Sequence, residues 1–428
     1  MRQFVTRHYA AYRRVFIIDS ISQLLTKLGG DIMRNTIITK NTFQIIHILL
    51  LFIVISNVNA YVGMCCAKCG GNMPMNIPGG GIPETNEYRV KISTMQMHMD
   101  GLRDGTNAVD GDSLLGMPVM MGSPTGKFMA VPTTMDMDML NVTTGYSFSD
   151  KFFAGLMLMY KQNSMDMKFN SAMQSMTGQD GFTMESEGLA DTMLMAKYRL
   201  FADDPLIPTN QASLMFGLSI PTGSIDERNT QHPLAARKKE LLPYSMQLGS
   251  GTFDPSIGYL YQSSHSPYWW GVNTTYTARL YDNDRDYRLG NEARLDLYGM
   301  YQFKYNWLAQ VQLNLHHQGS IRGEANESVS GASGHVTQNN AGSPYATPLW
   351  ETSNYGGTQA FVTLGLQWQP APLHIVDFSI GLPLYRDLNG PQLEQDYRIM
   401  LTWYIEIPTT KSIRYKFSKG SDNSQLGF

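Results

Sequence analysis

The chain has 428 residues, a formal net charge of −3 and only 16% charged residues. Nucleic-acid binding needs a strongly basic surface, so this composition argues against a nucleic-acid partner. The 39 glycines and 23 tyrosines instead favour a chain of β-strands and turns.

Residues 33–60 have the composition of an export signal peptide. They combine a basic start, an apolar run over residues 45–55 and a small-residue cleavage site that ends at Ala60. We therefore predict that residues 1–32 are a start-site artefact and that the mature chain begins at Tyr61. The apolar run is too short to cross a bilayer comfortably, and no later segment resembles a membrane helix. A closed barrel is then the remaining way to span a membrane.

Residues 61–86 form a segment rich in cysteine, methionine and glycine, which we expect in the periplasm before the barrel. Its only Cys-x-x-Cys pair lacks a second pair or a following histidine, so it is neither a zinc ribbon nor a haem-attachment site. Two interpretations stay open: a disulfide with one cysteine left over, or a soft copper(I) site that also uses neighbouring methionines. The residues concerned are Cys65, Cys66, Cys69, Met64, Met73 and Met75.

Methionine recurs at every second position in four segments after residue 87. This spacing places the methionines on one face of extended strands. In residues 151–163, for example, Met157 and Met159 share a face with Lys161, whereas Leu156 and Leu158 occupy the other. A leucine face toward lipid and a methionine face toward a partly polar lumen is the pattern of a transmembrane barrel. The methionines on this face are Met95, Met97, Met99, Met135, Met137, Met139, Met157, Met159, Met193 and Met195.

The whole pattern predicts an all-β fold, an up-and-down antiparallel transmembrane barrel of about 12 strands over residues 87–407. Residues 408–428 form a tail. Short connections alternate with long ones, as in barrels with periplasmic turns and external loops. The predicted strands are 87–99, 133–148, 151–163, 185–201, 211–221, 253–263, 267–281, 287–303, 306–319, 357–369, 372–385 and 396–407, with a long final loop at 386–395.

Two further groups of side chains mark the membrane edges. Five tryptophans at strand ends suit interfacial girdles: Trp269, Trp270, Trp307, Trp368 and Trp403. His98 lies on the outward face near the outer end of the first strand, where a solvated loop-end residue is the plain interpretation.

The segment Pro221-Thr222-Gly223, with residues 249–255 and the glycine-aromatic strand at Gly258 and Tyr259, resembles the outer-membrane family named for the meta-cleavage pathway of phenol degradation. The likeness covers residues 190–407 and implies an outer-membrane transporter. It does not supply the methionine strands or the cysteine-rich segment.

The sequence therefore predicts a channel or binding barrel in the outer membrane of a Gram-negative-type envelope. No Gly-x-Ser-x-Gly motif is present, and we expect no enzyme and no resident cofactor. The favoured cargo is a soft metal ion, copper(I) or silver(I), because 22 of the 28 methionines lie between Met64 and Met195, and thioethers suit such ions. Two alternatives stay open. The methionines line a path for small aromatic or hydrophobic molecules, or they only fill a structural barrel.

Overall fold

The computed structural model of the chain describes residues 73–77, 85–121, 123–204, 208–326, 345–371 and 373–412. The predicted start-site stretch, the signal peptide, the three cysteines and residues 413–428 of the tail lie outside this part of the chain. Within it, no helix combines the length and the apolar character needed to cross a bilayer.

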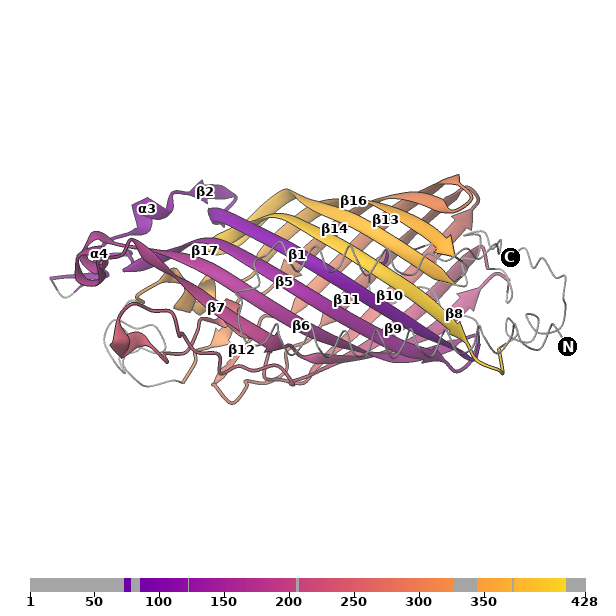
Figure 1. Ribbon diagram of the computed structural model, residues 1–428, viewed down its shortest axis with the longest axis horizontal. Helices are drawn as coiled ribbons and strands as arrows, with labels where there is room; N and C mark the ends of the chain where they lie inside the picture. Colours follow the sequence, from indigo (N-terminus) through magenta and orange to yellow (C-terminus); the bar gives the residue numbers. More distant parts are fainter. Residues whose placement is uncertain are drawn as a thin grey trace, which may run out of the picture. The chain divides into compact units, whose positions relative to one another are not determined.

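The described strands form one antiparallel sheet that closes on itself, because the last strand of the chain pairs with the first. Figure 1 shows these strands running obliquely along the barrel wall. In order around the ring, the labelled strands are β1 (Glu87–Gly105), β5 (Ala130–Ser147), β6 (Phe152–Phe169), β8 (Thr192–Ala202), β9 (Asn210–Ile220), β10 (Asp254–His265), β11 (Tyr268–Thr277), β13 (Glu292–Lys304), β14 (Trp307–Gln318), β16 (Gly357–Ala371) and β17 (His374–Pro408).

The long strand β17 is a hairpin that crosses the wall twice. Its first half pairs antiparallel with β16, from His374 to Leu388, and its second half pairs antiparallel with β1, down to Pro408. A strand that kept one direction could not satisfy both registers. The chain reverses near Gly390, where φ is +77°. The described wall therefore has twelve crossings, as predicted, although it carries eleven strand labels.

The remaining strands and helices lie mostly at the end of the barrel opposite the short turns (Figure 1). They are β2 (Asn107–Val109), α3 (Gly111–Leu114), β3 (Val119–Met120), β4 (Ser123–Pro124), α4 (Ser171–Thr177), β7 (Gly181–Leu189), β12 (Tyr287–Arg288), β15 (Arg322–Gly323) and four 3-10 helices, Ala235–Arg237, Tyr244–Met246, Pro348–Trp350 and Thr352–Asn354. The short turns mark the periplasmic end, because barrels of this type keep their long loops outside.

Two predicted elements are wrong in their boundaries. The strand expected at 185–201 is divided into β7 and β8, which pair with different parts of β6. The division has a polar cause, since the Asp191 carboxylate accepts hydrogen bonds from the backbone N–H groups of Gly223 (3.0 Å) and Ser250 (2.8 Å). The long loop expected at 386–395 is instead a tight hairpin end, because both halves of β17 stay paired almost to the turn.

The two faces of the strands divide as the alternation predicts. Leu158, Leu194 and Val311 are among the exposed large apolar side chains, which form the lipid-facing belt of the wall. None of the ten predicted methionines is among the exposed apolar residues. The methionine face is therefore turned to the barrel interior, which also holds buried charged and amide side chains such as Lys197 and Gln312.

Candidate functional site

The predicted methionines of the first two long strands lie directly opposite one another. Met95 pairs with Met139, Met97 with Met137, and Met99 with Met135. Residues in register on one face of an antiparallel pair have Cβ atoms about 5 Å apart, which brings the thioether chains together. We call this run across the strands the methionine ladder.

The ladder continues beyond β1 and β5 but is not complete. Met135 is in register with Met165 of β6, which is in register with Met184 of β7. Met157 pairs with Met193. By contrast, Met159 lies opposite Asn141, and Met195 lies opposite glycines on both neighbouring strands. The structure therefore brings eight of the ten predicted methionines into direct register with another methionine and leaves two beside other residues.

At the outer end of the barrel the ladder becomes a buried apolar cluster. Its buried members are Ala130, Met135, Met165, Met167, Phe169, Met173, Met184, Leu242, Met246 and Leu349, which we call the outer cluster. Leu242, Met246 and Leu349 come from the loops between β9 and β10 and between β14 and β16. These loops therefore fold back onto the methionine wall, and apolar side chains fill the outer mouth.

The short helix α4 positions one of these methionines. The Asn170 side chain caps the helix by accepting a hydrogen bond from the backbone N–H of Met173 (2.8 Å), and Gly178 ends it with a left-handed φ of +70°. The two caps hold a helix of only seven residues in place. As a result Met173, which is 3% exposed, points into the outer cluster.

A cavity opens beside the outer cluster, which we call the outer pocket. Its walls are apolar on one side and polar on the other. It is lined by Met129, Ala130, Met167, Phe169, Met173, Phe182, Met184, Asn229, His232, Arg237, Glu240, Leu241, Leu242, Pro243, Ala346, Thr347 and Trp350. The free space is about 50 Å³. One water needs about 10–15 Å³ on this measure, so the pocket holds a few waters or a small ligand fragment.

Two titratable side chains of the outer pocket have shifted pKa values, and both lie in an external loop. Burial raises the pKa of Glu240 to about 7, against the opposing effect of Arg237, whose guanidinium lies 3.6 Å from the carboxylate. Burial also lowers the pKa of His232 to about 4, with Arg237 acting in the same direction. At neutral pH His232 is uncharged and Glu240 is close to half ionised. One Glu240 oxygen, Oε1, is buried without a hydrogen-bond partner among the described residues.

Near the periplasmic end, the lumen contains a piece of the chain from before the first strand. Met73–Ile77, which we call the inner segment, belongs to the stretch predicted as periplasmic. The structure instead places it among inward-facing side chains. Gln367 donates to the Met73 carbonyl oxygen (2.8 Å), and Lys91 donates to the Met75 carbonyl oxygen (3.1 Å). Asn76 and Gln312 exchange two side-chain hydrogen bonds of 2.8 Å each.

Apolar contacts fix the same inner segment. Met73, Met75 and Ile77 are buried in a cluster with Met215, Leu260, Trp269, Tyr298, Met300, Leu308, Ile375 and Tyr404. Trp269 is 4% exposed and faces the lumen, so its predicted place in the lipid-facing girdle is wrong. Its neighbour Trp270, 47% exposed, takes the outward position. Side chains therefore fill the lumen near both ends, with the outer cluster at one and the inner segment at the other.

The residues that sequence reasoning missed share one property, which is that they come from loops or from the segment before the barrel. Nothing near His232 or Glu240 in the sequence marks them as pocket residues. A signal for the inner segment was present, however. The inward positions near the periplasmic turns carry an unusual set of amides, Gln262, Gln310, Gln312 and Gln367. Buried amides require hydrogen-bond partners, and part of these partners come from the inner segment.

A closed antiparallel barrel with an apolar belt and a filled polar interior defines the class of this protein. It is an outer-membrane β-barrel of a Gram-negative-type envelope, because such a wall satisfies all its backbone groups within the sheet. The sequence over residues 138–381 matches the family described as "Putative MetA-pathway of phenol degradation", and the chain belongs to that family. This confirms the resemblance noted in the sequence.

Solved structures with a similar fold are outer-membrane channels and transporters. An outer membrane channel from Pseudomonas putida F1 has a TM-score of 0.47 and 10% identity, over 77% of this chain and 100% of that one. The P. putida toluene transporter TodX has a TM-score of 0.37 and 8% identity, over 82% and 100%. A Pseudomonas aeruginosa FadL homologue has a TM-score of 0.35 and 10% identity, over 82% and 99%. No curated protein matches the sequence.

Proposed function

We propose that this barrel is a passive channel for small aromatic compounds of the phenol class, and that the outer pocket is their first binding site. The observation that carries the proposal is the make-up of that pocket. Methionine and phenylalanine form its apolar wall, and Glu240 also lines it, with one buried carboxylate oxygen, Oε1, that has no hydrogen-bond partner in the described part of the chain. The family description, which names phenol degradation, points to the same compounds.

The apolar wall suits an aromatic ring for two reasons. Thioether sulfur makes favourable contacts with ring edges, of about 0.3–1.5 kcal/mol each, and Phe169 and Phe182 already stack there with centroids 5.2 Å apart. A dry cavity that admits benzene measures roughly 150 Å³, about three times the present space. Methionine has three rotatable bonds, so Met173 and Met184 can move aside at low cost.

The carboxylate supplies the selectivity for a hydroxyl group. A phenolic O–H that donates to Glu240 Oε1 would give this buried oxygen the partner it lacks. A hydrogen bond to a charged acceptor is worth about 1.5–3 kcal/mol net. A phenol should therefore bind about tenfold or more better than the same ring without its hydroxyl. Passage toward the periplasm then requires the inner segment to leave its place beside Gln367 and Gln312.

The test compares two ligands that differ by one hydroxyl, 4-bromophenol and bromobenzene, on the full chain in detergent. Bromine quenches tryptophan fluorescence at short range, and Trp350 lines the pocket. We expect saturable quenching by both ligands, with an affinity about tenfold higher for the phenol. Trp350→Phe should remove the saturable signal, and Glu240→Gln should make the affinities of the two ligands similar. Equal affinities in the unaltered protein would contradict the role of Glu240. Quenching that does not saturate in the unaltered protein, as in Trp350→Phe, would contradict ligand binding in the outer pocket.

A second function is supported by the methionine ladder. The consecutive cross-strand pairs place neutral soft donors side by side along one wall, as the passage of copper(I) or silver(I) between neighbours would require. The predicted sulfur ligands for this role are the ten methionines named in the sequence analysis, eight of which lie in the ladder, together with Cys65, Cys66 and Cys69.

Silver(I) titration separates this second function from the first. The full chain is compared with a variant in which Met135, Met137, Met139, Met157 and Met159 are all leucine, a change that keeps the side-chain volume. A soft-metal path predicts fewer silver ions bound by the leucine variant. Equal silver binding by both proteins would exclude the soft-metal path. It would not bear on the proposed channel for aromatic compounds.

A further inference from the structure

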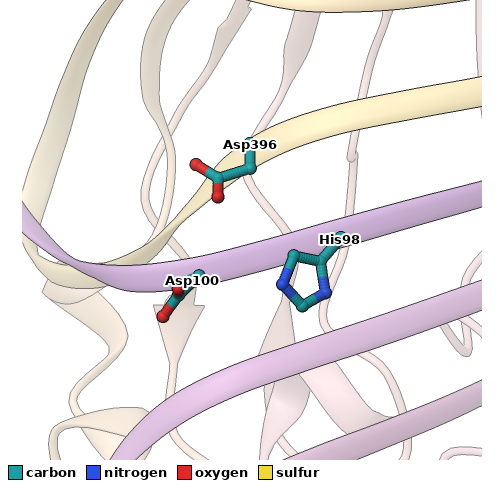
Figure 2. A group of neighbouring side chains, drawn as sticks. All are labelled: His98, Asp100 and Asp396. Atoms are coloured by element: carbon teal, nitrogen blue, oxygen red, sulfur yellow. The ribbon is translucent and has the colours of Figure 1, made fainter.

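A group of metal-ligating side chains lies on the outside of the barrel, away from the lumen and from the outer pocket. His98 and Asp100 belong to β1, and Asp396 belongs to the returning half of β17. One donor atom from each of the three lies within 4.8 Å of the others. Figure 2 shows the imidazole ring and the two carboxylates gathered over these neighbouring strands.

A β-bulge brings Asp396 to this face. His98 is in register with Tyr397, but Met99 is in register with Gln395, so Asp396 has no partner on β1. In a regular strand Asp396 would point to the opposite face from Tyr397, into the lumen. A bulge inserts one residue and redirects its side chain, and here the redirected carboxylate lies beside His98. Asp100, two positions after His98, shares its face by ordinary alternation.

The imidazole ring is held on two sides. Asp136 Oδ1 lies 2.7 Å from His98 Nδ1, and the Tyr397 ring stacks on the imidazole with centroids 5.6 Å apart and an angle of 26° between the planes. A carboxylate at Nδ1 favours the tautomer with the proton on Nδ1, which leaves the Nε2 lone pair free. Figure 2 shows the nitrogen farther from the main chain, Nε2, on the side of Asp100 and Asp396.

We propose that His98, Asp100 and Asp396 bind a divalent transition-metal ion, with Zn²⁺ the best fit, and that Asp136 orients the His98 ring without itself binding the ion. Three carboxylates alone would suit Mg²⁺ or Ca²⁺, but an imidazole nitrogen with two carboxylate oxygens suits Zn²⁺. Donor atoms around tetrahedral zinc lie about 3.3 Å apart, so small rotamer changes at the surface complete the site. The fourth position is left for water or for a phosphate oxygen of a lipid headgroup.

The site lies on the seam where the barrel closes. β1 and β17 are the first and last strands of the wall, and the ion joins His98 and Asp100 of one to Asp396 of the other. An ion that binds only the closed barrel stabilises it by mass action. The stabilisation grows with the logarithm of the ratio between the ion concentration and the dissociation constant. The donors also differ from those of the methionine ladder, because Met97 and Met99 alternate with His98 and face inward.

The test is calorimetric titration of the full chain in detergent with Zn²⁺, after alkylation of all thiols so that the cysteines do not bind the ion. The unaltered protein should bind one Zn²⁺ that is lost in His98→Gln and in Asp396→Asn. Asp136→Asn should weaken binding about 10- to 100-fold, because it removes only the orienting partner. His317→Gln is the matched control, since His317 also faces outward, bonded to Thr358 (2.9 Å), on another part of the wall.

A second readout excludes a loss of binding through misfolding. Folded barrels resist sodium dodecyl sulfate until heated, so the temperature at which the folded gel band disappears reports barrel stability. Zn²⁺ should raise this temperature in the unaltered protein and in His317→Gln, and leave it unchanged in a folded His98→Gln. The same Zn²⁺ stoichiometry in His98→Gln and in the unaltered protein would overturn the proposal. So would Ca²⁺ that displaces Zn²⁺ at equal concentration, because the group would then be an ordinary acidic surface.

Discussion

Gln367 donates a hydrogen bond from its side-chain amide to the backbone carbonyl oxygen of Met73, at 2.8 Å and across 294 positions of the sequence. Both residues are completely buried. This bond ties the inner segment to the barrel wall, and a small number of similar bonds from Lys91, Gln262 and Gln312 complete the attachment. Each such bond between neutral groups is worth only about 0.5–1.5 kcal/mol net, so the loss of one weakens the attachment, to which the buried side chains of Met73, Met75 and Ile77 also contribute.

Weakening this attachment should open the channel more often. Gln367→Ala removes the one bond from this side chain to the inner segment, worth about 1 kcal/mol, which favours the displaced segment about fivefold. We expect a several-fold rise in the open fraction of single-channel recordings in planar bilayers. Gln359→Ala is the control, because Gln359 faces inward near the other end of the same strand. An unchanged open fraction in Gln367→Ala would show that the inner segment does not limit conduction.

Close contact between β5 and β6 should make one glycine essential for folding. Gly155 is in register with Gly145, and a Cβ atom at Gly155 would overlap the carbonyl oxygen of Thr144, which is backbone and cannot move aside. At Gly299 of β13, an added Cβ would meet only Val311 Cγ1 at 4.0 Å. Gly155→Ala should therefore reduce the folded gel band after refolding, and Gly299→Ala should not. Equal yields would mean that the strands separate more easily than this packing indicates.

Binding of a purely apolar ligand should depend on pH through Glu240. Its pKa of about 7 means that the carboxyl is mostly neutral at pH 6 and mostly ionised at pH 8, whereas His232, with a pKa of about 4, is neutral throughout. Burying a carboxylate beside an apolar ring is unfavourable, so bromobenzene affinity should fall by up to about tenfold from pH 6 to pH 8. The affinity for 4-bromophenol should fall less, because its hydroxyl can donate to the carboxylate.

Glu240→Gln provides the control for this pH dependence. The glutamine side chain does not titrate, so the affinity of each ligand should be unchanged between pH 6 and pH 8. A fall in bromobenzene affinity that persists in Glu240→Gln would assign the titration to another group.

The size of the outer pocket should set the size of the ligand. Met184, 6% exposed, lines the pocket and packs in the outer cluster. Met184→Ala should enlarge the cavity and improve the binding of 2-naphthol relative to 4-bromophenol, measured by competition at the Trp350 signal. Met176→Ala, at a side chain that is 64% exposed, should leave the ratio unchanged. A ratio that also stays constant in Met184→Ala would place the ligand elsewhere.

The alternation of the sequence is sufficient to predict most of this barrel. Leu156, Met157, Leu158 and Met159 show both faces of β6 in four residues, since lipid and lumen impose opposite requirements on neighbouring side chains. The break between β7 and β8 could not be found this way, because the alternation continues through it. Its cause is Asp191, whose hydrogen-bond partners lie in a distant loop.

The candidate site was predictable only in part. The methionine ladder follows from the recurrence of methionine at every second position of neighbouring strands, because pairing of these strands places side chains of the same face opposite one another. The outer pocket also needs His232, Glu240 and Trp350 from two external loops, and local sequence does not determine how such loops fold back. The bulge that redirects Asp396 is likewise a local departure from alternation. The sequence pattern alone assigns the Asp396 side chain to the opposite face of the wall.

The most direct test of the channel account is the position of a bound ligand. Crystals of the full chain soaked with 4-bromophenol can be measured at the bromine absorption edge, where the anomalous signal locates each bromine atom. The account predicts a bromine peak inside the outer pocket, between Phe169 and Met184, with the phenolic oxygen toward Glu240. Bromine peaks confined to the lipid-facing belt, with none in the pocket, would contradict it.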